Sequence, residues 1–218
     1  MKDKVGVAIL VSGGGTNLQA IIDAKAAGQL PSCELLAVIS NKPEAYALKR
    51  AEKAGIAAYV VEKIGRGEAA QAEFEEKVSR IIDSSGAEMI VLAGFMCILS
   101  EKFVKKYPER IINVHPALIP SFCGKGFYGL RVHETALSYG VKVTGATVHF
   151  VNEIPDGGRI IMQKAVDVRE GDTPEVLQRR VMEEAEWKIL PASLEKVCAE
   201  ILKARKNPEN YDENNEDQ

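Results

Sequence analysis

The apolar residues of the first half of the chain follow two alternating patterns. Short continuous apolar runs, rich in β-branched residues, are typical of strands that are covered on both faces. They occupy residues 5–12, 35–39, 57–61, 89–93 and 111–114. Between them, apolar residues recur every three or four positions, which predicts helices that begin at Thr16, cover residues 44–54 and end at Gly86. Strands that alternate with helices indicate right-handed crossovers and a mainly parallel sheet.

The pattern changes after residue 115. Two prolines and two glycines predict a loop over residues 116–128, and a short helix is expected over residues 132–139. Residues 141–151 and 159–168 are strand-like. The turn-rich segment NEIPDGG separates them, so we expect an antiparallel pair.

One long helix is predicted near the end of the chain. Thr173 is its expected N-cap, Pro174 takes the first helical position, and the helix runs to about residue 204 with a bend at Pro191. Residues 206–218 are polar and acidic without apolar periodicity, which predicts a disordered tail. Together the patterns indicate an α/β fold: a Rossmann-like, mainly parallel sheet flanked by helices, with antiparallel C-terminal strands.

Composition narrows the class of protein. With 218 residues, 46% hydrophobic residues and a formal charge of −3, the chain reads as a soluble protein that binds neither nucleic acid nor membrane. The N-terminal apolar run is interrupted by Gly6, and no apolar stretch reaches the roughly 20 residues that span a bilayer. The cysteines are widely separated, so neither a metal site nor a redox pair is expected, and reduced thiols indicate a cytoplasmic location.

A glycine turn joins the first strand to the first helix. Gly13, Gly14 and Gly15 allow close approach of a ligand, and the helix that opens at Thr16 directs free N–H groups at an anion. The turn is not a Walker loop, and it fits a dinucleotide fingerprint poorly because Leu18 takes the third glycine position. We therefore expect a single phosphate, the alternative being a turn that only packs tightly.

Asn113 and His115 lie two positions apart on a predicted strand, so they share one face. Pro116 ends the strand, which places both at a carboxyl end of the sheet, where α/β folds bind ligands. An amide beside an imidazole suits chemistry that develops negative charge on an oxygen. A structural, hydrogen-bonded histidine is the alternative.

A carboxylate near His115 would favour its charged form. Asp156, in the turn PDGG, is the candidate, and His149 on the preceding strand is expected to support the pair. Asp-Gly is also a common turn pair with no attached chemistry.

These segments resemble the phosphoribosylglycinamide formyltransferases. The matching pieces are SGGGTNLQAII, VISNK, VLAGFMCILS, INVHPALIP, TVHFV, DGG and EEAEWKILP, which span nearly the whole chain apart from the tail. AGFM followed by NVHPALIP is specific to folate-dependent formyl transfer enzymes. The resemblance implies a single formyltransferase domain over residues 1–205, with a phosphate-binding half (1–115) and a folate-site half (116–205), acting on small-molecule substrates as a monomer or homodimer.

The resemblance also implies roles for individual residues. Formyl transfer from 10-formyltetrahydrofolate to the amine of 5-phosphoribosylglycinamide is the implied reaction. The residues that match the catalytic trio are Asn113, His115 and Asp156. Those that match acceptor contacts are Gly15, Thr16 and Asn17 for the phosphate and Glu186 for the ribose hydroxyls. Glu186 lies in an acid-rich segment, so a solvent-facing charge is its alternative.

A folate pocket is expected from two segments together with Asn113. They contribute Met96, Cys97, Ile98 and Leu99, and Asn152, Glu153, Ile154, Pro155 and Asp156. Met96 and Leu99 could equally be core. Two departures from relatives concern the folate tail: Cys97 stands where many have arginine, and the stretch near Gln71 lacks one. The loop over residues 121–131 is longer than in some relatives, and Lys125, Arg131 or His133 could substitute as anion contacts.

Other functions are open to the same residues. A methionyl-tRNA formyltransferase is expected to carry a further C-terminal domain and a basic surface, and a formyltetrahydrofolate hydrolase an N-terminal regulatory domain. Water in place of the amine would make the same site hydrolytic. A non-catalytic folate or nucleotide sensor is disfavoured by the intact trio, and a nicotinamide-dependent oxidoreductase by the glycine pattern.

Overall fold

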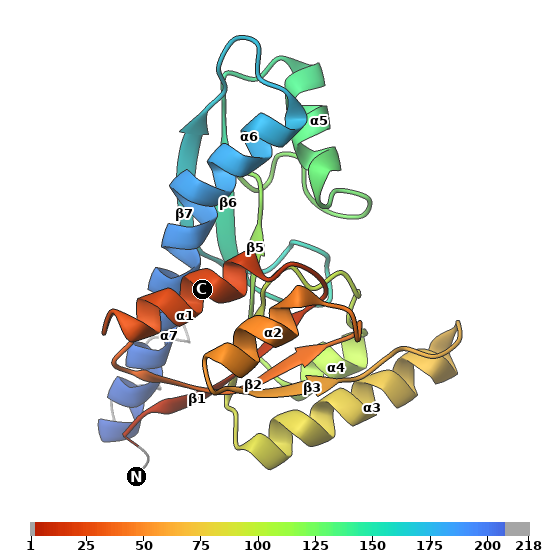
Figure 1. Ribbon diagram of the computed structural model, residues 1–218, viewed down its shortest axis with the longest axis vertical. Helices are drawn as coiled ribbons and strands as arrows, with labels where there is room; N and C mark the ends of the chain where they lie inside the picture. Colours follow the sequence, from red (N-terminus) through yellow and green to blue (C-terminus); the bar gives the residue numbers. More distant parts are fainter. Residues whose placement is uncertain (1–2, 208–218) are drawn as a thin grey trace, which may run out of the picture.

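Seven strands form one mixed sheet in the order β3-β2-β1-β4-β5-β6-β7 (Figure 1). This computed structural model describes residues 3–207. The strands are β1 (Val5–Val11), β2 (Cys33–Ser40), β3 (Ala57–Val60), β4 (Met89–Leu92), β5 (Ile111–His115), β6 (Val143–Phe150) and β7 (Ile160–Asp167). β1 to β5 are parallel, and β6 is antiparallel to both β5 and β7. The predicted fold class is confirmed.

Helices cover both faces of the sheet (Figure 1). They are α1 (Thr16–Ala26), α2 (Tyr46–Lys53), α3 (Glu68–Ser85), α4 (Glu101–Lys106), α5 (Leu130–Tyr139), α6 (Pro174–Val181), the π-helical turn η1 (Met182–Glu186) and α7 (Trp187–Lys206). One face packs against α1, α2, α6 and α7, and the other packs against α3 and α4. β1 serves both layers because alternate side chains of a strand point to opposite faces. Ile9 faces the first layer and Leu10 the second, and both are fully buried.

The reversal of strand direction creates a projection beyond the parallel sheet. β5 pairs with β6 only between Ile112↔Phe150 and His115↔Thr147. The start of β6 therefore extends past the end of β5, paired with β7 alone. α5 and α6 lie beside this extension, in the upper part of Figure 1. The carboxyl end of β5 consequently lies where the parallel sheet meets the extension.

Two local predictions need correction. α4 was not expected, although Ser100 caps it by accepting a hydrogen bond from Phe103 N. The last helix was expected to bend at Pro191, but Pro191 lies inside α7 and the irregular segment is η1. Pro191 lacks the N–H that would bond to the carbonyl of Trp187 one turn earlier, and the irregular turn η1 directly precedes that residue.

Within residues 3–207, no helix is both long and apolar enough to cross a membrane. Most of the acidic tail expected over residues 206–218 lies outside the described residues, and α7 extends to Lys206.

Candidate functional site

A cleft of about 710 Å³ opens where the carboxyl ends of β1, β4 and β5 meet the loop before α5. The catalytic and acceptor-binding residues expected from the sequence all line it, namely Gly15, Thr16, Asn17, Asn113, His115, Asp156 and Glu186. They come from segments far apart along the chain. The topology therefore brings them to one place.

The glycine turn approaches the cleft at the start of α1. Gly15 is the N-cap residue of α1 and has a left-handed backbone, with φ of 72°. A Cβ atom at Gly15 would lie 2.6 Å from Cβ of Ala47, so only glycine fits between the turn and α2. The first turn of α1 carries no acidic residue. Its unpaired N–H groups and the positive end of the helix dipole therefore favour an anion.

Ser12 joins the glycine turn to the loop that follows β4. Its Oγ donates to Asn41 Oδ1 at 2.7 Å and accepts from Met96 N at 2.8 Å. The two walls of the cleft are thus held together by one hydroxyl.

Asn113 and His115 come from β5, and His149 lies beside them on β6. Asn113 pairs with His149 in the strand register, and Asn113 Nδ2 lies 3.3 Å from His149 Nε2. His149 Nδ1 lies 2.7 Å from the carbonyl oxygen of Phe150. Because a carbonyl oxygen only accepts, Nδ1 of His149 donates, which leaves Nε2 to accept from Asn113.

Asp156 lies between the two imidazoles. Its carboxylate oxygens are 3.6 Å from His115 Nδ1 and 3.6 Å from His149 Nε2. Asp156 has a left-handed backbone with φ of 57°, a conformation that Asp and Asn tolerate better than most residues. The loop before α5 makes a hydrogen bond to each member of the Asp156–His115 pair. Gly124 N donates to Asp156 at 2.8 Å, and Phe122 O accepts from His115 Nε2 at 2.9 Å.

Burial decides the protonation of His115. Its exposed fraction is 4%, and this desolvation lowers its pKa below the ordinary 6.5. The charge of Asp156 and the bond to Phe122 raise the pKa without offsetting burial. In this arrangement Asp156 lies 3.6 Å from His115, so its charge favours the protonated imidazole by less than burial disfavours it.

Asp156 itself is an ionised carboxylate at neutral pH. Burial alone would raise its pKa, but the neighbouring imidazole of His149, the charge that His115 carries when protonated and the Gly124 N–H together hold the pKa below its ordinary value. The site therefore pairs a proton-accepting carboxylate with two imidazoles.

Glu186 is the second acidic group of the cleft. It is 5% exposed, and its Oε2 accepts a hydrogen bond of 2.7 Å from Asn17 Nδ2. Burial raises the pKa of Glu186 to about 7, and the bond from Asn17 only partly opposes this. The alternative of a solvent-facing charge is wrong. The π-helical turn carries Glu186 inward, although its neighbour Glu183 is exposed.

Comparison with known proteins identifies the family of the chain. The formyl transferase family matches residues 5–194. The chain belongs to the formyl transferase family.

Several members of the formyl transferase family are similar along most of the chain. Phosphoribosylglycinamide formyltransferase of Haemophilus influenzae is 38% identical, over 85% of this chain and 83% of that protein. The trifunctional purine biosynthetic protein adenosine-3 of Gallus gallus is 45% identical over 90% of this chain. The chain spans about a fifth of the length of that trifunctional relative, 19%. A crystal structure of glycinamide ribonucleotide transformylase 1 from Symbiobacterium toebii has a TM-score of 0.83 and 37% identity, covering 92% of this chain and 90% of that one.

The residues expected at a formyl transferase folate pocket divide into two groups. Met96, Cys97, Ile98, Pro155 and Asp156 line the cleft, as does Asn113. Leu99, Asn152, Glu153 and Ile154 are not among its lining residues. Leu99 packs against the core under α3, as its alternative reading held, and Asn152 accepts from Ile154 N within its own loop.

The cleft also contains residues that sequence reasoning did not single out. Gln178 and Met182 line it from α6 and η1. Phe95, after β4, and Phe127 and Tyr128, before α5, line it as well. Gln178, Met182 and Glu186 recur at every fourth position, which is the signal that could have placed them on one helix face. Lys125, one of the three anion contacts suggested from the sequence, lies on the loop before α5 and lines the cleft.

Two further suggestions concerned anion contacts and metal. His133 is fully buried, and Arg131 is not a lining residue of the cleft. Over the described part of the chain, no group of three or more His, Cys, Asp or Glu side chains is arranged to hold a metal ion.

Proposed function

We propose that this formyl transferase moves the formyl group of 10-formyltetrahydrofolate to the amine of 5-phosphoribosylglycinamide, giving formylglycinamide ribonucleotide and tetrahydrofolate in purine biosynthesis. The observation that carries the proposal is the convergence in one cleft of Asn113, His115 and Asp156 with an anion-binding helix start. Relatives of similar length that bear the name phosphoribosylglycinamide formyltransferase support the choice of acceptor.

The two ends of the cleft suit the two substrates. The start of α1 suits the acceptor phosphate, and Glu186 is placed to accept from ribose hydroxyls. Met96 and Ile98 are 53% and 72% exposed and border the cleft, so they offer apolar surface to the flat rings of a folate.

10-Formyltetrahydrofolate supplies an electrophilic formyl carbon attached to its N10. The lone pair of the acceptor amine attacks this carbon, a new C–N bond forms, and the carbonyl oxygen gains negative charge. The carbonyl then re-forms as the bond to N10 breaks, and the proton that leaves the amine reaches N10.

Residues of the trio assist both stages. Asn113 Nδ2 carries two N–H groups, so its bond to His149 leaves a second for the charged oxygen. The Nε2–H of His115 is given to Phe122 O, so His115 adds a further donor, its Nδ1–H, when it is protonated during the reaction. Asp156 accepts the amine proton and relays it through His115 to the leaving nitrogen. Closer approach of Asp156 to His115 would raise the pKa of His115 and favour this relay.

Residues 1–205 are proposed to form one formyltransferase domain, with the phosphate site in residues 1–115. The folate site takes Met96, Cys97, Ile98 and Asn113 from that same half and Pro155 and Asp156 from residues 116–205. We further propose a cytoplasmic enzyme, monomer or homodimer, whose free cysteines stay reduced.

The deciding experiment measures formyl transfer from 10-formyltetrahydrofolate to 5-phosphoribosylglycinamide by pure protein, with formate release followed in parallel. The proposal expects formylated acceptor in amounts equal to the tetrahydrofolate produced, and little formate without acceptor. Equal formate release with and without acceptor would identify a hydrolase instead.

A further inference from the structure

The first two carbonyl groups of the glycine turn, those of Gly13 and Gly14, are held from outside the cleft by α2. Gly13 O accepts from Ala47 N at 3.1 Å, and Gly14 O accepts from Arg50 Nε at 2.8 Å. Figure 1 shows why α2 can reach the turn: α1 and α2 lie side by side.

These bonds matter because of peptide geometry. In a trans peptide the C=O and the following N–H point in opposite directions. The bond from Arg50 to Gly14 O therefore fixes the direction of Gly15 N–H, and the bond from Ala47 to Gly13 O fixes that of Gly14 N–H. Side-chain packing does not replace these bonds, since a Cβ at Gly13 or Gly14 would have no heavy atom within 4 Å. Glycine peptides without such restraint rotate at little cost.

We propose that Arg50 is a positioning residue for phosphate binding: by holding Gly14 O outward, it keeps the Gly15 N–H directed into the cleft. The inference rests on the proposed phosphate site of the acceptor.

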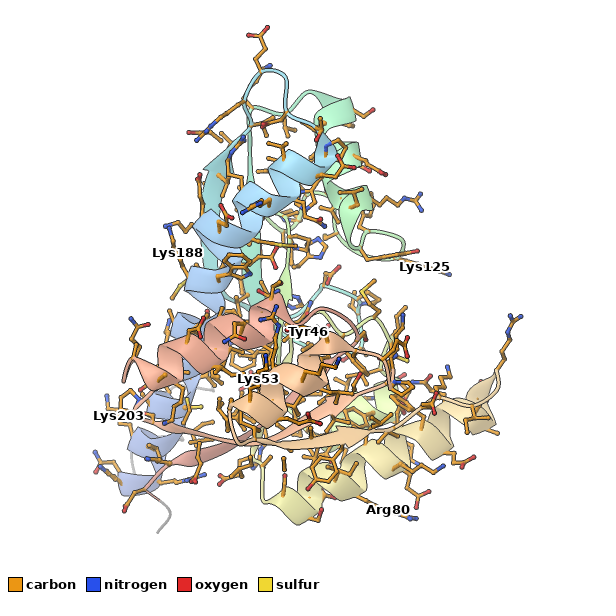
Figure 2. The ribbon with its side chains drawn as sticks, in the orientation of Figure 1. Tyr46, Lys53, Arg80, Lys125, Lys188 and Lys203 are labelled. Atoms are coloured by element: carbon orange, nitrogen blue, oxygen red, sulfur yellow. The ribbon has the colours of Figure 1, made fainter. Side chains whose placement is uncertain are left out.

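Arg50 is itself held in place by three contacts. Its Nη1 donates to Gln19 Oε1 on α1 at 2.8 Å, and its guanidinium lies 5.0 Å from the ring centroid of Tyr46. Tyr46 is at the start of α2, near the start of α1 (Figure 2). The Cδ of Arg50 lies 3.4 Å from the Cβ position of Gly15, so the stem of the side chain also borders the turn. These contacts limit the freedom that Arg50 would otherwise lose on ligand binding.

Arg50 could act by orienting the Gly14–Gly15 peptide through its N–H group or by placing a positive charge near the phosphate. Two variants separate these roles. Arg50→Gln keeps an N–H donor at the position of Nε but removes the charge, whereas Arg50→Met keeps a similar stem and removes both. The matched control is Arg80→Met on α3, whose exposed side chain pairs with Glu76 far from the cleft (Figure 2).

The measurements are the KM for the phosphorylated acceptor, kcat, and the Kd for ribose 5-phosphate. For Arg50→Met we expect KM and Kd to rise about tenfold, because a charge-assisted hydrogen bond is lost, while kcat changes little. Arg50→Gln should stay within about threefold of the parent protein, since the oriented N–H is restored. Arg80→Met should leave all three unchanged.

Equal losses in Arg50→Gln and Arg50→Met would overturn the orientation role in favour of a charge effect. Unchanged binding in Arg50→Met, or a fall in kcat without a change in KM, would also overturn it. The ribose 5-phosphate Kd needs no formyl donor. If the parent protein fails to transfer a formyl group yet Arg50→Met weakens ribose 5-phosphate binding, the proposed function fails and the role of Arg50 stands.

Discussion

Asn17 and Glu186 are 169 positions apart along the chain, yet their side chains share a buried hydrogen bond of 2.7 Å. The bond joins the start of α1 to the end of η1 and closes one side of the cleft. It also leaves a carboxyl group in a place where its charge is poorly solvated. Function and stability therefore oppose each other at Glu186.

Glu186→Gln should increase stability and weaken acceptor binding. The pKa of Glu186 is raised from 4.5 to about 7, so the folded protein holds more protons than the unfolded chain between these values. The free energy of unfolding of the parent protein therefore falls across this window as pH rises. The advantage of Glu186→Gln should grow from pH 4.5 to 7 and approach about 3 kcal/mol. Urea unfolding of both proteins at several pH values measures this stability difference. A difference that does not change with pH would contradict the raised pKa of Glu186.

His133 should produce the opposite pH dependence. It is fully buried, and neither ring nitrogen has a hydrogen-bond partner among the described residues. Burial, with a smaller effect of His115, lowers its pKa to about 4. The unfolded chain then binds the proton first as pH falls from 6.5, so stability is lost between about 6.5 and 4. The free energy of unfolding of the parent protein should fall by about 3 kcal/mol over this range because of His133, and this fall should be absent in His133→Leu. Parallel pH profiles of the variant and the parent protein would refute the prediction.

Asp156→Asn tests the trio with little change of shape. Asn tolerates the left-handed backbone at position 156, so folding should be preserved. Without the carboxylate the amine proton has no acceptor, and kcat should fall by about 10²- to 10⁴-fold. Circular dichroism checks that the variant is folded, and single-turnover formyl transfer measures the rate of the chemical step. Near-normal turnover would remove Asp156 from the mechanism.

Thr16→Val and Asn17→Ala should act on acceptor binding and not on chemistry. Both residues lie at the start of α1, and Asn17 also holds the carboxyl of Glu186. We expect a higher KM for the acceptor with a nearly unchanged kcat, and the larger effect in Asn17→Ala, because the buried carboxyl loses its donor. If only kcat falls in steady-state assays, the phosphate site has been placed wrongly.

Gly15→Ala and Gly28→Ala form a matched pair. Both glycines have a φ near 70°, so an alanine costs about 1 kcal/mol of backbone strain at either position. A Cβ at Gly28 meets nothing within 4 Å, whereas at Gly15 it would lie 2.6 Å from Ala47. Gly15→Ala should therefore be the less stable variant in thermal unfolding and the only one of the two to lose ribose 5-phosphate affinity. Equal behaviour of the pair would show that α2 does not confine the turn.

The elements most clearly predicted from sequence were those with local signals. The run that ends at Ser12, the glycines and the helix opened by Thr16 carry their own pattern, and the antiparallel β6–β7 pair follows from its turn. α4 escaped notice because six residues span fewer than two helical turns and show little periodicity.

The site was predictable in its members but not in its electrostatics. Residue types and spacing indicated that Asn113 and His115 share a face. The desolvation of His115 and Glu186, by contrast, depends on contacts between distant segments, and no local pattern encodes it. The same holds for Arg50, whose contact with Gly14 O requires that α2 pack beside the turn.

The π-helical turn η1 determines how the apolar side of α7 is oriented relative to that of α6. Buried Leu177, Val181, Ala185 and Ile189 recur at every fourth position, whereas a regular α-helix repeats every 3.6 residues. The additional residue accommodated in η1 absorbs that drift, so that α6 and α7 turn their apolar sides toward one core. Deleting one residue ahead of Glu186 would remove the wide turn and leave a regular α-helix, in which Leu177 and Ile189 would again agree to within roughly 20° around the helix axis. The apolar sides of α6 and α7 would stay aligned, and the loss would fall on the turn itself, which carries Glu186 into the cleft.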